Sequence, residues 1–421
     1  MLDLFRRLIG WFGIVLGVLA LTACAPQKTV VNFVFMRTSD QTQPYWQQVI
    51  ADFEAANPSI RVNLNVFTWD EGRQRIDEMI SQGKPPNLAR VATRWIPEYV
   101  AAGLVEPVDT YLTDQFRAEF IPRLIQQGAQ YQGRTFGLPI TVSARALYYN
   151  KDLFRRAGIS APPKTWDELR TAALKLSQQN GVTGFGLQGG VGTTPEVQTY
   201  FYYFLWGNGG DVLTPDGIRT AFDSPAGVEA LTYLSELIQS GATQPDPTVD
   251  DRKSLETGFV LGKFGMVITG PWLATRLAAE APNLAYGVAP IPNRSAPATL
   301  AAEDTLIVFK QADNKAAAWK FVEFLYQDKY RLDYALREGV LPEKISVAND
   351  PKFKNNTVTA FFTEQLSTAR FEPLNTQSGN IANLVTQAVQ PVYQGKQKPL
   401  DALRAAAAKA NELLAYSATS W

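Results

Sequence analysis

The sequence predicts an α/β protein of two lobes, and two observations support this fold class. From residue 30 onwards, apolar runs of strand length alternate with runs of helical periodicity, an order that places helices against a sheet. The chain has 421 residues, which is more than one hydrophobic core normally supports, so two compact units are expected.

The first unit begins with a strand, a helix and a second strand. Residues 30–35 (VVNFVF) form an apolar run that is typical of a buried strand. A helix follows from about Pro44 until the Asn-Pro pair at 57–58 ends it. Residues 60–66 alternate between apolar and polar, which predicts a half-buried strand, and residues 88–92 predict a third strand.

Later helices carry their own start signals. Thr165 followed by Glu168 predicts a capping box, in which each residue bonds the backbone of the other. Ser224 is expected to cap a second helix, with Pro225 at its first position. An alanine-rich helix punctuated by leucines between residues 400 and 414 closes the chain.

The N-terminus has the features of a lipoprotein signal peptide. Two arginines precede the apolar run 8–20, and the small residues before Cys24 complete a lipobox. We expect removal of residues 1–23, acylation of the Cys24 thiol, and a polar tether over 24–29 that leaves the body of the protein outside the cytoplasm, on the periplasmic side or at the cell surface. A plain signal peptide with an incidental cysteine is the alternative. Cys24 is the only cysteine, so no internal disulfide is possible.

The composition argues against several classes of function. Basic and acidic residues number 40 each, so nucleic acid is not an expected partner. The chain contains no histidine, which removes the commonest general base and the commonest metal ligand. We therefore expect no metal, no cofactor and no enzymatic activity, although paired carboxylates remain available for catalysis.

Four stretches, taken in order and spacing, resemble the extracellular solute-binding proteins of family 1, the maltose-binding-like group. The resemblance covers nearly the whole chain after the signal peptide. The four stretches are residues 148–154 (YYNKDLF), 162–169 (PPKTWDEL), 208–211 (NGGD), and 259–266 (FVLGKFGM) running into 270–272 (GPW).

This resemblance implies a two-lobed periplasmic-binding-protein fold, with a multi-segment hinge and a ligand cleft between the lobes. The first crossing is expected near 139–143, the return near 303–305 and the last exit near 327–328. The expected first lobe comprises residues 30–142 and 303–327, and the second comprises 143–302 and 328–421.

The resemblance also implies a function. The protein would bind a small carbohydrate by lobe closure and deliver it to the transmembrane permease subunits of an ABC importer. It would act as a monomer, held to a bacterial membrane by the lipid on Cys24.

A sugar presents an apolar ring face that stacks on aromatic rings and hydroxyls that bond carboxylates, amides and guanidinium groups. Loops after predicted strands of the first lobe carry such residues, at the strand ends where open α/β sheets bind ligands. The candidates there are Arg37, Ser39, Asp40, Trp69, Asp70, Arg94 and Trp95.

In the family, the tryptophan of a Gly-Pro-Trp motif stacks on sugar, so Trp272 is the main candidate. Ser143 departs from the family pattern, which has a glutamate near this position, and this places maltose itself in doubt. The dense aromatic run 200–206 must be mostly core, with two residues favoured for the cleft. The remaining candidates are Ser143, Arg145, Tyr202, Trp206, Glu303, Asp304 and Arg370.

Other functions remain open on the sequence. A secreted glycoside hydrolase would need two facing carboxylates, for which Asp70, Glu71, Glu303 and Asp304 are available. A binder of a polyol phosphate could use Arg37 and Arg94, and binders of peptide or ferric ion are further possibilities. A structural lipoprotein that contacts only proteins is the last alternative.

Overall fold

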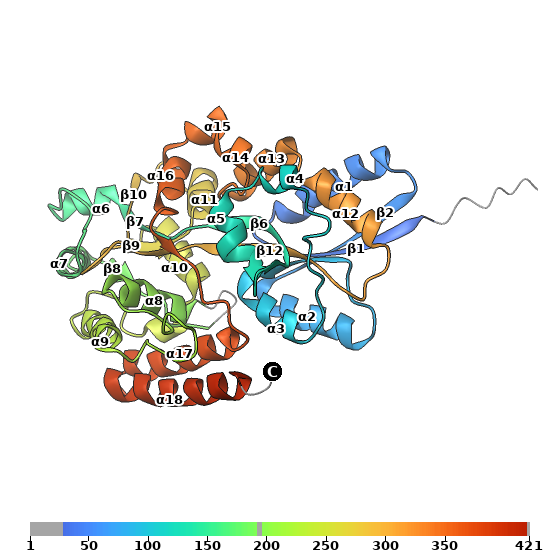
Figure 1. The fold of residues 1–421 in the computed structure, drawn as a ribbon. Helices are drawn as coiled ribbons and strands as arrows, with labels where there is room; N and C mark the ends of the chain where they lie inside the picture. The colour runs from blue at the N-terminus through green and yellow to red at the C-terminus, as the bar shows by residue number, and fades with distance from the viewer. Residues whose placement is uncertain (1–27, 192–195, 419–421) are drawn as a thin grey trace, which may run out of the picture.

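Two separate β-sheets organise the chain, and helices cover both of them (Figure 1). The computed structural model describes residues 28–191 and 196–418. The predicted signal peptide and Cys24 lie outside the described residues.

The first sheet has five strands in the order β2-β1-β3-β12-β6. β1 pairs in parallel with β2 and β3, whereas β12 runs antiparallel to both β3 and β6. The strands are β1 (Thr29–Met36), β2 (Ile60–Phe67), β3 (Leu88–Ala92), β6 (Gly137–Ser143) and β12 (Ala302–Val308).

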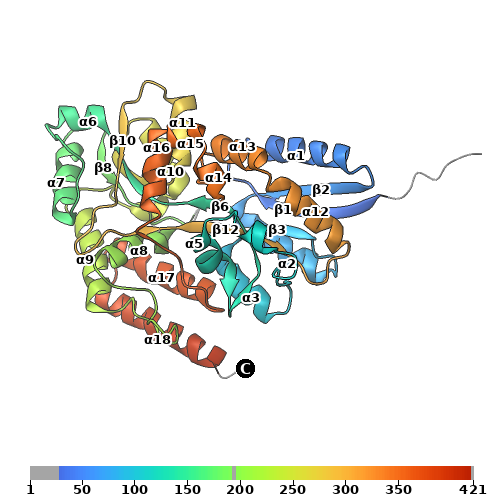
Figure 2. The ribbon, with the colours of Figure 1, turned by 45° about the horizontal axis from the view of Figure 1, so that its top comes forward.

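Helices from both ends of the sequence cover this sheet. The views in Figures 1 and 2 place α1, α12 and α13 on one side, with α2 and α3 on the other. These helices are α1 (Thr42–Ala56), α2 (Trp69–Ser81), α3 (Ile96–Ala101), α12 (Lys315–Leu325) and α13 (Asp328–Glu338). Short elements complete the lobe: η1 (Thr93–Trp95), α4 (Asp114–Arg117), α5 (Pro122–Leu124), the π-helical turn η2 (Ile125–Ala129), β4 (Gln130–Tyr131) and β5 (Arg134–Thr135).

The second sheet has four strands in the order β10-β7-β9-β8. Its strands are β7 (Ala146–Asn150), β8 (Thr183–Gly186), β9 (Phe264–Thr269) and β10 (Tyr286–Ala289). Around it lie α6 (Lys151–Arg156), α7 (Trp166–Ser177), α8 (Val197–Gly207), α9 (Pro225–Gln239), α10 (Arg252–Val260) and α11 (Trp272–Glu280).

The C-terminal part of the chain extends the second lobe. The long helices α17 (Ser378–Tyr393) and α18 (Pro399–Ala418) pack against each other and against α9 (Figure 2). The other elements are η3 (Pro247–Val249), α14 (Ile345–Ala348), α15 (Pro351–Lys354), α16 (Thr357–Gln365), and the short parallel pair β11 (Thr299–Leu300) and β13 (Ala369–Arg370). Within the described ranges, no helix combines the length and apolar character needed to cross a bilayer.

The chain passes between the lobes in extended segments. β6 and β12 pair up to Ser143 and Ala302, and each strand then continues directly into the second lobe. A third segment lies beside them, where the backbone N–H of Leu341 donates to the carbonyl of Val142 at 2.8 Å.

The contacts of α13 place this third crossing later than the sequence suggested. The Tyr45 hydroxyl of α1 donates to the Tyr330 carbonyl at 2.7 Å, and the ring centroids of Tyr45 and Tyr334 lie 5.2 Å apart. α13 therefore packs against a helix of the first sheet, and we place the exit near Leu341 instead of at 327–328.

The two predicted helix starts have different outcomes. The capping box is confirmed, because the Thr165 hydroxyl accepts from the Glu168 N–H and the Glu168 carboxylate accepts from the Thr165 N–H. The expected cap by Ser224 is wrong: Pro225 opens α9, but the Ser224 hydroxyl makes no capping bond. A proline at the first helical position already removes one unsatisfied N–H.

A buried ion pair lies beside the crossing segments. Arg331 of α13 donates from Nε to the Glu343 carboxylate at 2.6 Å, and both side chains are almost completely buried. Arg331 also donates to the carbonyl of Ile140 in β6. The pair therefore joins α13, the third crossing and the first crossing strand.

Removing one partner of this pair should destabilise the protein strongly. Glu343→Ala leaves the Arg331 charge buried without a counter-ion, and we expect the free energy of unfolding to fall by about 3–5 kcal/mol in urea titration. The control is Glu236→Ala, which breaks the half-exposed ion pair with Arg170 and should cost about 1 kcal/mol or less. Equal losses in the two variants would contradict this role for the buried pair.

Candidate functional site

Aromatic and charged side chains gather where β2 and β3 end in the first lobe. The rings of Trp69 and Trp95 pack edge to face, with centroids 6.0 Å apart, and both are half-buried. The guanidinium of Arg90 lies 5.1 Å from the Trp69 centroid, and that of Arg73 lies 5.3 Å from the Trp95 centroid. The structure thus brings two predicted tryptophans together, each beside a cation.

Arg90 is a member of this group that sequence reasoning missed. It lies in the buried strand β3 and donates from Nε to the Asp304 carboxylate at 3.0 Å. It also donates to the Met36 carbonyl and the Thr38 hydroxyl, each at 2.7 Å. Asp304 is therefore held by an arginine of its own sheet. An arginine inside an otherwise apolar strand was the available signal, because a buried cation needs partners.

Arg94 connects the two lobes. It donates to the Glu372 carboxylate, in the segment between α16 and α17, at 3.1 Å. Beside this ion pair is a cavity of about 10 Å³, lined in part by Tyr202 and Ile381. A space of this size holds about one water molecule and cannot hold a sugar ring.

Trp272 lies in the second lobe as the first residue of α11 and is partly buried. A Cβ atom on Gly270 would lie 2.2 Å from the indole ring, so the glycine is needed for the ring to fold back over the end of β9. The indole N–H donates to the Glu256 carboxylate at 2.7 Å. Glu256, another residue missed on the sequence, also accepts from the Thr269 hydroxyl.

Two arginines contact the same indole. The guanidinium carbon of Arg145 lies 4.8 Å from the Trp272 centroid, and that of Arg252 lies 4.6 Å away. Both guanidinium groups donate to a single oxygen of Glu196, at 2.9 Å and 2.8 Å respectively. The Ser143 hydroxyl accepts from Arg145 at 2.8 Å and so belongs to this group.

The electrostatics of this group keep its carboxylate charged. Burial alone would raise the pKa of Glu196, but the charges of Arg145 and Arg252 outweigh burial and lower it. The pKa of Arg145 is correspondingly raised by Glu196, against the opposing effect of burial. Both shifts favour the charged forms of Glu196 and Arg145, which form an ion pair at 2.9 Å.

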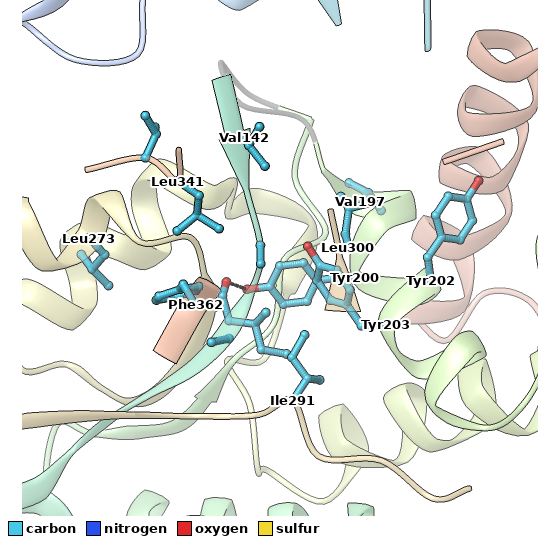
Figure 3. Packing of buried hydrophobic residues seen from close by; sticks show 14 of the residues in the cluster. Val142, Val197, Tyr200, Tyr202, Tyr203, Leu273, Ile291, Leu300, Leu341 and Phe362 are labelled. Carbon is cyan, nitrogen blue, oxygen red and sulfur yellow. Dashed lines mark hydrogen bonds between the residues drawn. The ribbon is translucent and has the colours of Figure 1, made fainter. Parts of the chain in front are cut away.

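In the aromatic run of α8, we expected Tyr202 and Trp206 to face the ligand cleft, and the structure separates the two. Trp206 is buried, and its indole N–H donates to Asp211 at 3.1 Å, so the structure places it in the core and not at a ligand surface. Tyr202 is also buried, but it lines the small cavity beside Arg94. Figure 3 shows Tyr202 on the opposite side of α8 from Tyr200 and Tyr203. A nearly continuous aromatic run gives no periodicity from which this division could be predicted.

The other predicted residues lie apart from Trp272 and its charged partners. Arg37 and Asp40 are exposed and form a loose ion pair at 3.8 Å, and the Ser39 hydroxyl accepts from the Gln41 N–H in the same turn. Asp70 is exposed at the start of α2, where the Thr68 hydroxyl lowers its pKa. Arg370 is exposed and pairs with Asp211 at 2.9 Å.

Glu303 is buried and has an unusual environment. Neither carboxyl oxygen has a hydrogen-bond partner among the described residues, and the carboxyl fills the space where a Cβ on Gly128 would lie. Burial raises the pKa of Glu303 well above its usual range, and the charges of Asp304 and Glu343 add to this effect. Burial without a partner therefore favours the neutral, protonated form of this carboxyl.

No group of three or more histidine, cysteine, aspartate or glutamate side chains suited to a metal occurs within 28–191 and 196–418. Three of the carboxylates considered for hydrolysis have distinct environments. Asp304 binds Arg90, Glu303 is buried with no hydrogen-bond partner among the described residues, and Glu71 accepts from the Thr68 N–H in the capping box of α2.

Comparisons with known proteins match this architecture. The family model described as bacterial extracellular solute-binding protein matches residues 39–331. A putative binding protein of Brucella abortus (strain 2308) is 39% identical over 402 residues, covering 95% of this chain and 96% of its own. The maltotriose-binding protein of Pyrococcus abyssi is 27% identical over 323 residues, covering 75% of this chain and 67% of its own.

A solved structure is similar along most of the chain. An ABC transporter solute-binding protein from Thermotoga lettingae, bound with alpha-D-tagatose, has a TM-score of 0.84 and 28% identity. The match covers 92% of this chain and 100% of that one. This likeness confirms the predicted two-lobed fold.

Glu303 should make stability depend on pH. Because its pKa is raised in the folded state, the wild type loses stability as pH rises above about 4.3, where the unfolded glutamate ionises. Glu303→Gln is neutral throughout and lacks this loss, so its free energy of unfolding relative to the wild type should increase from pH 4 to pH 8 in urea titrations. Glu236→Gln, in an exposed ion pair, is the control. A difference for Glu303→Gln that stays constant with pH would contradict the assignment.

Proposed function

Because this chain belongs to the family of bacterial extracellular solute-binding proteins, we propose that it is the substrate-binding component of an ABC importer for a small carbohydrate. The observation that carries the proposal is the indole group of the second lobe, in which Trp272 lies among Arg145, Arg252, Glu196 and Glu256. The tryptophan pair of the first lobe supplies further aromatic surface.

This chemistry suits an uncharged polyhydroxylated solute. An indole offers an apolar face to sugar C–H groups, while guanidinium and carboxylate groups donate to and accept from hydroxyls. Each cation of the indole group already has a carboxylate partner, so the group carries no excess charge that would call for an ionic ligand. Oligosaccharides and polyol glycosides have these properties.

The relatives support the same ligand class. The Thermotoga lettingae protein is described as bound with alpha-D-tagatose, and the Pyrococcus abyssi protein as maltotriose-binding. They differ in the sugar, so they support a carbohydrate without identifying which one this chain binds. Ser143, bonded here to Arg145, differs from the glutamate expected near this position in the maltose-binding pattern.

The mechanism is reversible closure, with no bond made or broken. A solute that contacts both lobes stabilises the closed arrangement over the open one by its additional contacts in the closed state. The closed complex is then presented to the permease subunits. We propose that the protein is not an enzyme and that it acts as a monomer outside the cytoplasm.

The phosphate alternative finds less support in the geometry. Arg37 and Arg94, the two arginines considered for a phosphate, do not converge: Arg37 pairs with Asp40, and Arg94 pairs with Glu372. A phosphate site needs converging donors that are free to bind an anion.

Removing the indole should weaken carbohydrate binding. Trp272→Ala should reduce affinity for the bound saccharide by about 1–3 kcal/mol, the range for a buried aromatic contact, measured by isothermal titration calorimetry. Trp319→Phe changes a tryptophan stacked on Tyr111 in the first lobe and should leave affinity unchanged. Unchanged affinity in Trp272→Ala would remove Trp272 from the site.

The lipid anchor is tested separately. Cys24→Ser should abolish incorporation of labelled fatty acid and move the protein from the membrane fraction to the soluble extracytoplasmic fraction, because the acylated thiol is lost. The single cysteine makes the assay specific. Retention of label in the variant would exclude Cys24 as the acylated residue.

A further inference from the structure

Glu196 holds two cations with one oxygen atom. Oε1 accepts from Arg145 at 2.9 Å and from Arg252 at 2.8 Å, and both guanidinium groups lie against the Trp272 ring. Glu196 directly precedes α8, whereas Arg145 directly precedes β7 and Arg252 begins α10. One carboxylate therefore ties three separate elements to the indole.

The formal charge of this group is zero because of Glu196. The two arginines are balanced by Glu196 and Glu256, and Glu256 lies 3.6 Å from Arg252 Nε. The neighbouring Arg94 is already paired with Glu372. Neutralising Glu196 alone would thus leave one uncompensated positive charge beside the indole.

The charged residues around Trp272 also include hydrogen-bond donors without acceptors. The Nε atoms of Arg145 and Arg252 and the hydroxyl of Tyr203 are buried and have no hydrogen-bond partner within the described part of the chain. Tyr203 lies close enough to Arg145 and Glu196 for both charges to act on its pKa. An anion is the kind of group that would satisfy these buried donors, and the charge of Glu196 opposes its approach.

Solvent reaches two members of this group more than the third. The side chains of Glu196 and Arg252 are 18% and 20% exposed, whereas Arg145 is 4% exposed. Arg145 is therefore the most deeply buried of the three, and Glu196 and Arg252 are more accessible to a solute.

We propose that Glu196 is a specificity-determining residue, the built-in counter-ion that makes this site reject anionic saccharides such as uronic acids and accept neutral ones. The inference rests on the proposed function for its ligand class. A solute carboxylate approaching the wild type meets the Glu196 charge and cannot displace it from two guanidinium groups. A like charge is one of the repulsive elements by which a binding site discriminates against a wrong ligand.

The test compares wild type with Glu196→Gln in calorimetric titrations of D-glucuronate, inorganic sulfate and a panel of neutral mono-, di- and trisaccharides. We expect wild type to bind neither anion detectably, and Glu196→Gln to bind both at least tenfold more tightly, with the gain lost at high salt. Affinity for the neutral saccharide should fall or stay constant. Glu236→Gln, which neutralises an exposed Glu–Arg pair in the same lobe, is the control and should show no gain.

A second variant tests the charge argument directly. Glu196→Gln/Arg252→Gln restores a neutral group, so the gain in anion binding should disappear. Circular dichroism and urea titration establish that each variant is folded; if Glu196→Gln is not, Glu196→Ala removes the same charge and takes its place.

The outcomes separate the two proposals. If a folded Glu196 variant binds sulfate and glucuronate no better than wild type, the role of Glu196 is overturned, even where wild type binds a neutral saccharide. If wild type binds no saccharide in the panel, the proposed function fails, and the sulfate titration still decides whether Glu196 is the counter-ion.

Discussion

The pairing of β6 with β12 is the constraint on which the two-lobed arrangement depends. The two strands complete the first sheet, and at Ser143 and Ala302 both continue directly into the second lobe. The third segment joins them through the bond from Leu341 to Val142. Because the lobes are connected by short extended segments, a change in their relative orientation would require changes in only a few backbone dihedrals.

The candidate site combines aromatic surface with charges that cancel locally. In the first lobe, Arg90 is held by Asp304 beside Trp69. In the second, Arg145 is held by Glu196 beside Trp272. Each half thus presents an indole next to a neutralised guanidinium, and this is the common feature that a neutral, hydroxyl-rich solute would recognise.

The sequence predicted the fold better than the site. The strands β1, β2 and β3 and the Thr165 cap follow from residue patterns that are local in the chain. The partners of Arg145 and Trp272 could not be found this way, because Glu196 and Glu256 come from distant segments and only the tertiary fold brings them together. The expected position of Trp206 was wrong for a different reason, because a nearly continuous aromatic run does not reveal which side of the helix faces the core.

The central claim is that an uncharged saccharide contacts both lobes and holds them together. Small-angle X-ray scattering of the purified protein, with and without each member of a neutral saccharide panel, tests it most directly. The account predicts that at least one saccharide reduces the radius of gyration and raises the melting temperature in parallel, because the ligand binds the closed state. A panel in which no neutral saccharide changes either quantity would contradict it.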